Sequence, residues 1–364
     1  MSALKDRLRA FGFRRWRLMA VEAVLCLACV LSAAGLWAVK EAVDVSAGER
    51  FAGESGQRFS QVAAFLPVGQ GKSEEDILAF RQALENKFVE QALKTPENGS
   101  LYVDAYSGRS DVTVATEHGT AGVTAFGVGG DFFYFHPLAL HSGAYIAERD
   151  LMDDLVVLDE VLAWRLFGGT ELAGLTVYIN GAPFVVSGVV SMEDDFASRA
   201  ARKDEGCLFM SFSAMKKLNE EAAIDCYEIV LPDPITGYGR SVVGETFSDG
   251  AVVENTGRYS PRRLVEVAKD FGHRSMRADG VIYPYWENAR RLTEDYAALL
   301  LFLTVLFAVV PALSVLVLAI QAARSGWRRG VGTIRAKLEA AMEQRRERQY
   351  GEFLEKKGEN TWHS

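Results

Sequence analysis

Two long apolar segments interrupt an otherwise mixed chain. Residues 18–39 are apolar except for Glu22, and residues 297–323 carry only three polar side chains and one helix breaker, Pro311. Each segment has about the 20 residues that a helix needs to cross a bilayer. The hydrophobic pattern therefore predicts two membrane helices. They divide the chain into a basic segment 1–17, a helix 18–40, a central domain 41–295, a helix 296–323 and a basic helical tail 324–364.

Other interpretations of the two apolar segments stay open. Either one could be the buried core helix of a soluble protein. The first could also be a cleaved signal peptide, because small residues at 31–34 suit a cleavage site. Against cleavage, the apolar run continues past those residues through Leu36, Trp37 and Val39.

The first part of the central domain alternates between strand and helix patterns. Residues 60–67 are typical of a strand, and residues 73–94 repeat apolar side chains at helical spacing after Ser73, which predicts an N-cap. Three short runs rich in Val, Tyr and Thr follow over residues 101–128, with glycines between them, and predict three strands. A strand, a helix and then strands indicate an α+β fold.

The segment FLPVGQGKSEED, residues 65–76, resembles a nucleotide-binding loop. Gly71, Lys72 and Ser73 stand in the order of a P-loop, but its first glycine would fall at Leu66. The glycines are therefore better explained as allowing a turn between a strand and the helix that Ser73 caps.

A second local pattern follows further along. Residues 155–158 predict a buried strand, after which Asp159 caps a short helix that ends at Gly168. Asn180 and Gly181 stand between two apolar strands, and this pair is a strong hairpin signal because both residues tolerate positive φ.

These residues resemble a known family. The segments GVGGDFFYFHPLALHSGAYI, VVLDEVLAWRLFGG and LAGLTVYINGAPFVVSGVV follow one another in the order and at roughly the spacing found in the extracytoplasmic core domain of MacB-type permeases. That family belongs to the FtsX-like branch of ABC transporter permeases. The resemblance implies an α+β periplasmic core domain that lies between two membrane helices. This domain would have two lobes: a porter-like α/β lobe and a smaller β-rich lobe at about residues 130–225.

The chain also departs from the family pattern. A family permease continues after its outer domain with three membrane helices, and a cytoplasmic segment between them engages the ATPase. Here one apolar helix is followed by a basic tail. The resemblance therefore implies a reduced form without the C-terminal three-helix bundle.

Charge predicts the orientation in a bacterial plasma membrane. Residues 1–18 hold six Lys or Arg against one acid, and residues 324–364 hold ten against six, although the whole chain has a net charge of −8. The positive-inside rule then places both ends in the cytoplasm and the acidic central domain outside. No basic patch typical of nucleic-acid binding remains.

A few residues are candidates for a functional role. Tyr283, Tyr285 and Trp286 precede the second apolar segment, where an aromatic belt at the outer headgroups is expected. A partner surface that also includes Arg290 and Arg291 is the alternative, and Glu287 and Arg291 stand at i, i+4 spacing. Within the apolar segments, Glu22 and Pro311 are the candidates, since an intramembrane carboxylate is costly and Pro311 predicts a kink.

Catalytic and metal-binding chemistry is not indicated. The histidines and acidic clusters lack the spacing of zinc or calcium ligands, and no G-x-S-x-G elbow is present. Cys207 and Cys226 could form a disulfide or remain buried thiols. We therefore expect no enzyme, no cofactor and no metal site.

Two functional hypotheses follow. The first is an accessory or reduced subunit of an ABC-type complex, whose partners are a separate ATPase, a multi-helix permease and the bilayer. The second is a membrane-anchored sensory or binding module that keeps the fold without transport. A homo- or hetero-dimer is compatible with both, and the sequence names no cargo.

Overall fold

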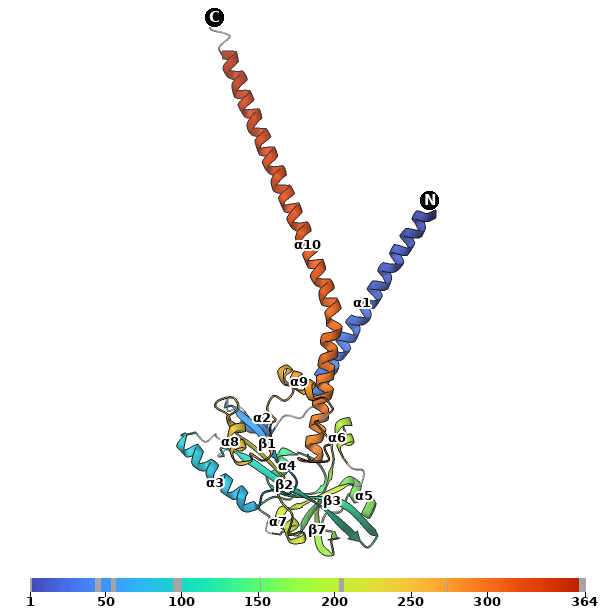
Figure 1. The fold of residues 1–364 in the computed structure, drawn as a ribbon, viewed down its shortest axis with the longest axis vertical. Coiled ribbons are helices and arrows are strands. Elements are labelled where there is room, and N and C mark those ends of the chain that lie inside the picture. Colours follow the sequence, from blue (N-terminus) through green and yellow to red (C-terminus); the bar gives the residue numbers. More distant parts are fainter. Residues whose placement is uncertain are drawn as a thin grey trace. The chain divides into compact units, whose positions relative to one another are not determined.

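The computed structural model describes residues 2–42, 47–53, 57–93, 100–150, 152–202, 206–272 and 274–359 (Figure 1). The end of the predicted tail, residues 360–364, lies outside them. The chain divides into two compact units, one of residues 35–301 and the other of residues 1–34 together with 302–364.

The helices are α1 (Ser2–Ala42), α2 (Ala47–Ala52), α3 (Glu74–Glu90), α4 (Phe132–Phe135), α5 (Glu160–Phe167), α6 (Phe196–Ala201), α7 (Phe212–Leu218), α8 (Tyr238–Thr246), α9 (Pro261–Val267), the 3₁₀ turn η1 (Ala268–Asp270) and α10 (Tyr285–Glu359). The strands are β1 (Phe59–Phe65), β2 (Val103–Thr116), β3 (Gly119–Gly130), β4 (Ala139–Gly143), β5 (Leu155–Asp159), β6 (Thr176–Ile179), β7 (Ala182–Ser191), β8 (Cys207–Ser211), β9 (Cys226–Pro232) and β10 (Ala251–Glu254).

The strands of the described residues join into one ten-stranded mixed sheet. Its order is β10-β1-β9-β2-β3-β8-β5-β7-β4, with β6 paired to β2 and β7. The sheet therefore runs without interruption through both predicted lobes, and the α+β prediction is confirmed. The prediction of three strands over residues 101–128 is wrong: β2 and β3 form one long hairpin, because glycines inside a strand do not by themselves end it.

Strand alternation gives the sheet two differently covered faces. Along β9, Tyr227, Ile229 and Leu231 pack with α3 and α8, whereas Cys226 and Val230 belong to a second core cluster on the other face. That second cluster also contains Trp286 from the start of α10. Because successive strand residues point to opposite faces, Glu228 is directed to the α10 side together with Cys226 and Val230.

Local signals in the sequence are reproduced by the structure. Ser73 caps α3 through a capping box with Asp76, and the Cβ that a side chain at Gly71 would add meets the Cβ of Ala223 at 2.5 Å. Asn180 and Gly181 have φ of 48° and 85° in the turn between β6 and β7. The loop at residues 65–76 is therefore a strand-to-helix turn, as predicted.

Asp159 caps α5 from a buried position, so its protonation reports on the stability of the central domain. Its side chain is 3% exposed and accepts the Leu162 N–H at 2.8 Å. Burial raises the pKa of Asp159 from 3.8 to about 6, although the N–H groups of Leu162 and Cys207 oppose the rise.

We expect Asp159→Asn to become more stable relative to the wild type as pH rises from 4 to 7. The folded carboxyl keeps its proton up to about pH 6, whereas the unfolded carboxyl loses it near its ordinary pKa, so wild-type stability falls across this window by about 3 kcal/mol. Asparagine caps a helix about as well as aspartate. Urea unfolding of both proteins at pH 4, 5, 6 and 7 measures the difference, and parallel pH profiles would contradict the prediction.

The apolar segments both form helices. Two stretches, in Trp16–Lys40 of α1 and Tyr285–Trp327 of α10, are long and apolar enough to cross a membrane, and only 6% and 0% of their apolar windows are buried inside the protein. This exposure contradicts the buried-core-helix alternative. Within the unit of residues 1–34 and 302–364, Thr304 donates a hydrogen bond to Ser32 at 3.1 Å.

Candidate functional site

The first turns of α10 lie inside the central domain rather than beside it. Tyr283, Tyr285 and Trp286 are 5%, 9% and 3% exposed. The Trp286 ring lies 5.3 Å from Phe126 and 5.5 Å from Phe132 between ring centroids, on the face of the sheet described above. The aromatic-belt prediction is therefore wrong, because these rings are enclosed by core side chains and cannot face headgroups.

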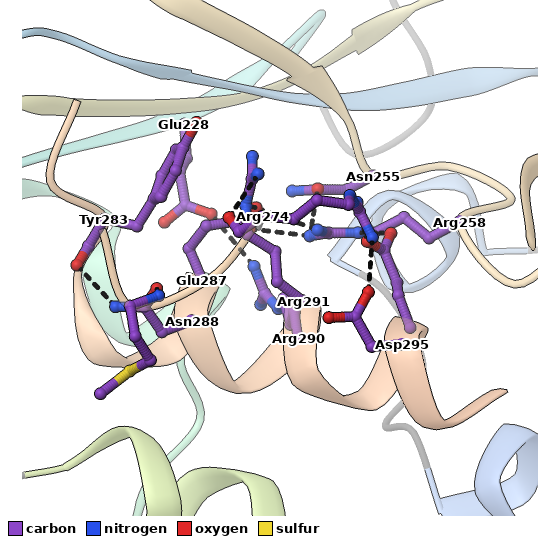
Figure 2. Close-up of polar contacts among 12 residues, drawn as sticks. Glu228, Asn255, Arg258, Arg274, Tyr283, Glu287, Asn288, Arg290, Arg291 and Asp295 are labelled. Carbon is purple, nitrogen blue, oxygen red and sulfur yellow. Dashed lines mark hydrogen bonds and ion pairs between the residues drawn. The ribbon is translucent and has the colours of Figure 1, made fainter. Parts of the chain in front are cut away.

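A buried network of ion pairs surrounds this part of α10 (Figure 2). At its centre Arg258, between β10 and α9, donates two hydrogen bonds to Glu287 at 2.8 and 2.9 Å and one to Glu294 at 2.7 Å. Both glutamates are 0% exposed and Arg258 is 3% exposed. Such a bidentate pair between a guanidinium and a carboxylate fixes the relative orientation of the two groups as well as their distance.

Further charges extend the network along α10. Arg291 donates to Glu287 at 2.6 Å, which confirms the i, i+4 pair, and its guanidinium lies 3.7 Å from the centroid of the Tyr283 ring. Arg274, from the preceding loop, pairs with Glu294 and with Asp295. Three consecutive turns of α10 are thereby held by charged side chains.

The network reaches the central sheet through Glu228 on β9. Its carboxylate lies 2.5 Å from the Nε2 atom of His136 and 3.5 Å from Arg290 of α10. Burial would raise the pKa of Glu228, but His136 and Arg290 outweigh that effect and lower it. No local pattern in the sequence marks this pair, because the two residues are 92 positions apart.

The remaining predicted residues are placed as follows. Arg291 is buried and Arg290 is half-buried, so of the predicted partner surface only Arg290 is accessible. Glu22 and Pro311 are half-buried within α1 and α10, and α10 continues through Pro311. Cys207 and Cys226 are buried free thiols. Among the described residues no cluster of three or more His, Cys, Asp or Glu side chains could hold a metal ion.

The arrangement is suited to holding a helix in place. Its carboxylates and guanidinium groups are matched with one another, and removing either partner would leave a buried charge. These ion pairs can attach the start of α10 to three parts of the domain, namely the sheet, the segment after β10 and the loop around Arg274.

Comparisons with known proteins found a sequence-family match and similarities to solved structures. The sequence model described as the MacB-like periplasmic core domain matches residues 35–236. Among solved structures, the periplasmic region of MacB from Actinobacillus actinomycetemcomitans is 17% identical with a TM-score of 0.39, and the alignment covers 53% of this chain and 88% of that one. The extracellular domain of the noncanonic ABC-type transporter YknZ from Gram-positive bacteria is 15% identical with a TM-score of 0.35, covering 52% and 90%. A comparison with curated protein sequences found no match.

Proposed function

Because the chain belongs to the family of MacB-like periplasmic core domains of ABC transporter permeases, we propose that it is an accessory or reduced subunit of an ABC-type complex. In this proposal the central domain lies outside the membrane and both termini lie in the cytoplasm. A separate ATPase hydrolyses ATP, and the outer domain engages a partner or transmits motion. Catalysis belongs to the partner chain.

The buried network at the start of α10 is the observation that carries this proposal. Arg258 and Arg274 hold Glu287, Glu294 and Asp295, and α10 then continues as one helix through its apolar stretch. A helix clamped by matched buried charges has little freedom to pivot at that end. A displacement of α10 is therefore passed to the outer domain instead of being absorbed in a flexible joint.

The tail of α10 offers a contact for the ATPase. Ile334, Leu338 and Met342 are spaced four residues apart and are 62%, 57% and 58% exposed. Residues at this spacing share one face of a helix. An apolar stripe on a charged helix suits docking on a cytoplasmic subunit, although a basic helix also binds anionic lipid.

Co-purification tests the proposal. The full chain, tagged at its N-terminus and extracted in mild detergent after brief crosslinking, is expected to bring down an ATPase and a multi-helix permease. A triple variant, Ile334→Ser, Leu338→Ser and Met342→Ser, should reduce the recovered ATPase at least tenfold, because the docking stripe loses its apolar surface. A matched control, Lys337→Ser with Glu339→Ser, changes exposed residues outside the stripe and should retain it.

Recovery of the chain alone would contradict the proposal. The second candidate function, a membrane-anchored binding module, would then gain support, and it is favoured by a cavity of about 750 Å³ beside α10. Export or accumulation of substrates unchanged after deletion of the gene would point the same way.

A further inference from the structure

A cavity of about 750 Å³ lies beside the first turns of α10, and Asn255, Arg258 and Arg290 of the ion network are among its lining residues. Its walls are mainly apolar and aromatic, with Phe135, Phe196, Trp286, Tyr296, Leu299 and Leu300 among them. A volume of this size falls in the range of small-molecule sites, which are typically apolar with a few placed polar groups.

Two buried hydrogen-bond donors on the cavity residues lack an acceptor. Among the described residues, neither the Trp286 indole nitrogen nor the Asn255 amide nitrogen has a hydrogen-bond partner, and the side chains are 3% and 8% exposed. Turning the Asn255 amide over would not solve this, because its oxygen already accepts from Arg258 at 3.0 Å. Unpaired buried donors are costly, so a bound group that supplies acceptors would be stabilised here.

A positively charged side chain also lines the cavity. Arg290 lines the cavity, and its side chain is 28% exposed, with Glu228 3.5 Å away. That separation is longer than an ordinary N–H···O hydrogen bond. Arg290 can therefore offer its remaining N–H groups to an anionic ligand while its charge stays close to Glu228.

The carboxylates on the cavity wall already have partners. Asp195 caps α6 by accepting from the Ala197 and Ser198 N–H groups at 2.8 and 3.1 Å. Glu193 accepts from Ser198, and Asp194 pairs with Arg199. Each of these carboxylates thus already has a donor, whereas the buried Trp286 and Asn255 nitrogens have no acceptor among the described residues, which favours an acceptor-rich, anionic ligand group over a cation.

The apolar wall continues onto the two helices that are long enough to cross a membrane. Val39 of α1 and Leu299 and Leu300 of α10 line the cavity, and each lies within one of the two predicted spans. A ligand that enters from a bilayer could keep its hydrocarbon in contact with apolar side chains along this route.

We propose that this cavity binds a single-chain membrane lipid with an anionic headgroup. The headgroup contacts Arg290, Asn255 and Trp286, and the acyl chain lies along Phe196, Tyr296 and Leu299. The inference goes beyond the proposed transport role and does not depend on an ATPase partner; it requires only that the two helices cross a bilayer.

Photo-crosslinking of the full chain in phosphatidylcholine nanodiscs tests this inference. The probe is a 16-carbon fatty acid with a diazirine at the chain end, used at pH 8. We expect saturable labelling of the peptide that contains Phe196, which lies in the outer domain outside both spans. Shortening the chain by two methylenes should weaken the labelling affinity about tenfold, because each buried CH₂ contributes about 0.8 kcal/mol.

Three variants separate the headgroup site from the acyl site. Thr293→Trp fills the cavity from α10 and should abolish labelling, whereas Thr293→Val keeps the size of the side chain and should not. Arg290→Met should weaken binding of the acid about tenfold through the lost charge-assisted hydrogen bond, but leave binding of the corresponding neutral alcohol unchanged.

Two results would overturn the inference. Labelling confined to the two apolar helices, or labelling at Phe196 that survives Thr293→Trp, would show only contact with the bilayer. Equal loss of acid and alcohol binding in Arg290→Met would remove the assignment of the anionic headgroup to this residue. Hydrogen exchange of the variants distinguishes local blocking from unfolding, since a folded outer domain keeps its β3 and β8 amides protected.

Discussion

Replacing Arg258 by methionine is expected to destabilise the central domain by about 3–5 kcal/mol, the cost of removing one partner of a buried ion pair. The substitution leaves Glu287 and Glu294, both 0% exposed, without the guanidinium that bridges them. Arg291 and Arg274 remain as their other partners, so both carboxylates stay charged in a site that no longer balances them. The fall in the free energy of unfolding should therefore be large.

Urea unfolding of the purified full chain measures this loss, and the exposed pair Arg335 and Glu339 provides a control. These two side chains are 81% and 64% exposed at 3.3 Å, and Arg335→Met should change stability by less than about 1 kcal/mol. Arg258→Lys keeps the positive charge but loses the bidentate geometry of the guanidinium group. Its loss of stability should therefore fall between those of Arg258→Met and Arg335→Met. Equal effects of Arg258→Met and Arg335→Met would show that the network does not hold α10.

The same network predicts a sensitivity to acid. Burial would raise the pKa of Glu287, but Arg258, with help from Arg291 and Arg290, lowers it from 4.5 to about 2. A carboxyl whose pKa is lower in the folded state stabilises the fold above its unfolded pKa and loses that contribution as pH falls. Wild-type stability should therefore decrease between about pH 4.5 and pH 2, and Arg258→Met should show a smaller decrease.

Local features of the fold could be predicted because a few neighbouring residues determine them. Ser73 and Asp76 are enough for a capping box, and Asp159 and Gly168 fix the two ends of α5. The Asn180-Gly181 turn sets the register of β6 against β7. Each of these predictions needed only a short window of sequence and a known backbone preference.

The candidate site could not be predicted in the same way because its members are distant in sequence. Arg258 and Glu287 are 29 positions apart, and His136 and Glu228 are 92 apart. Nothing in the composition of residues 254–260 marks Arg258 as buried, since arginine is mostly exposed unless it is paired. The strand register that directs Glu228 toward α10 appears only when β9 is placed between β1 and β2.

The aromatic prediction failed for a related reason. Aromatic residues that precede an apolar helix suit a headgroup belt and a core equally well in sequence. Position relative to the sheet decides between them, and here Phe126 and Phe132 enclose Trp286. A stability measurement can therefore separate the two environments.

Trp286→Ala is expected to destabilise the central domain by about 3–5 kcal/mol, because it opens a cavity in a packed core. Trp286 is 3% exposed, and its ring also lies 4.7 Å from that of His136, so the vacancy would disturb the His136 and Glu228 pair as well. Trp164, 60% exposed on α5, is the matched control, and Trp164→Ala should cost no more than about 0.5 kcal/mol.

Amide hydrogen exchange of the full chain in detergent resolves where the change occurs. Peptides from β3 and β8 report the opening of the sheet domain, and their protection should fall by about two to three and a half orders of magnitude in Trp286→Ala, since about 1.4 kcal/mol corresponds to a factor of ten. Peptides from the apolar part of α10 should keep their protection. A headgroup anchor would give the reverse pattern, with an unchanged sheet and altered exchange at the end of the membrane helix, because a ring in the interface contributes nothing to packing between β3 and β8.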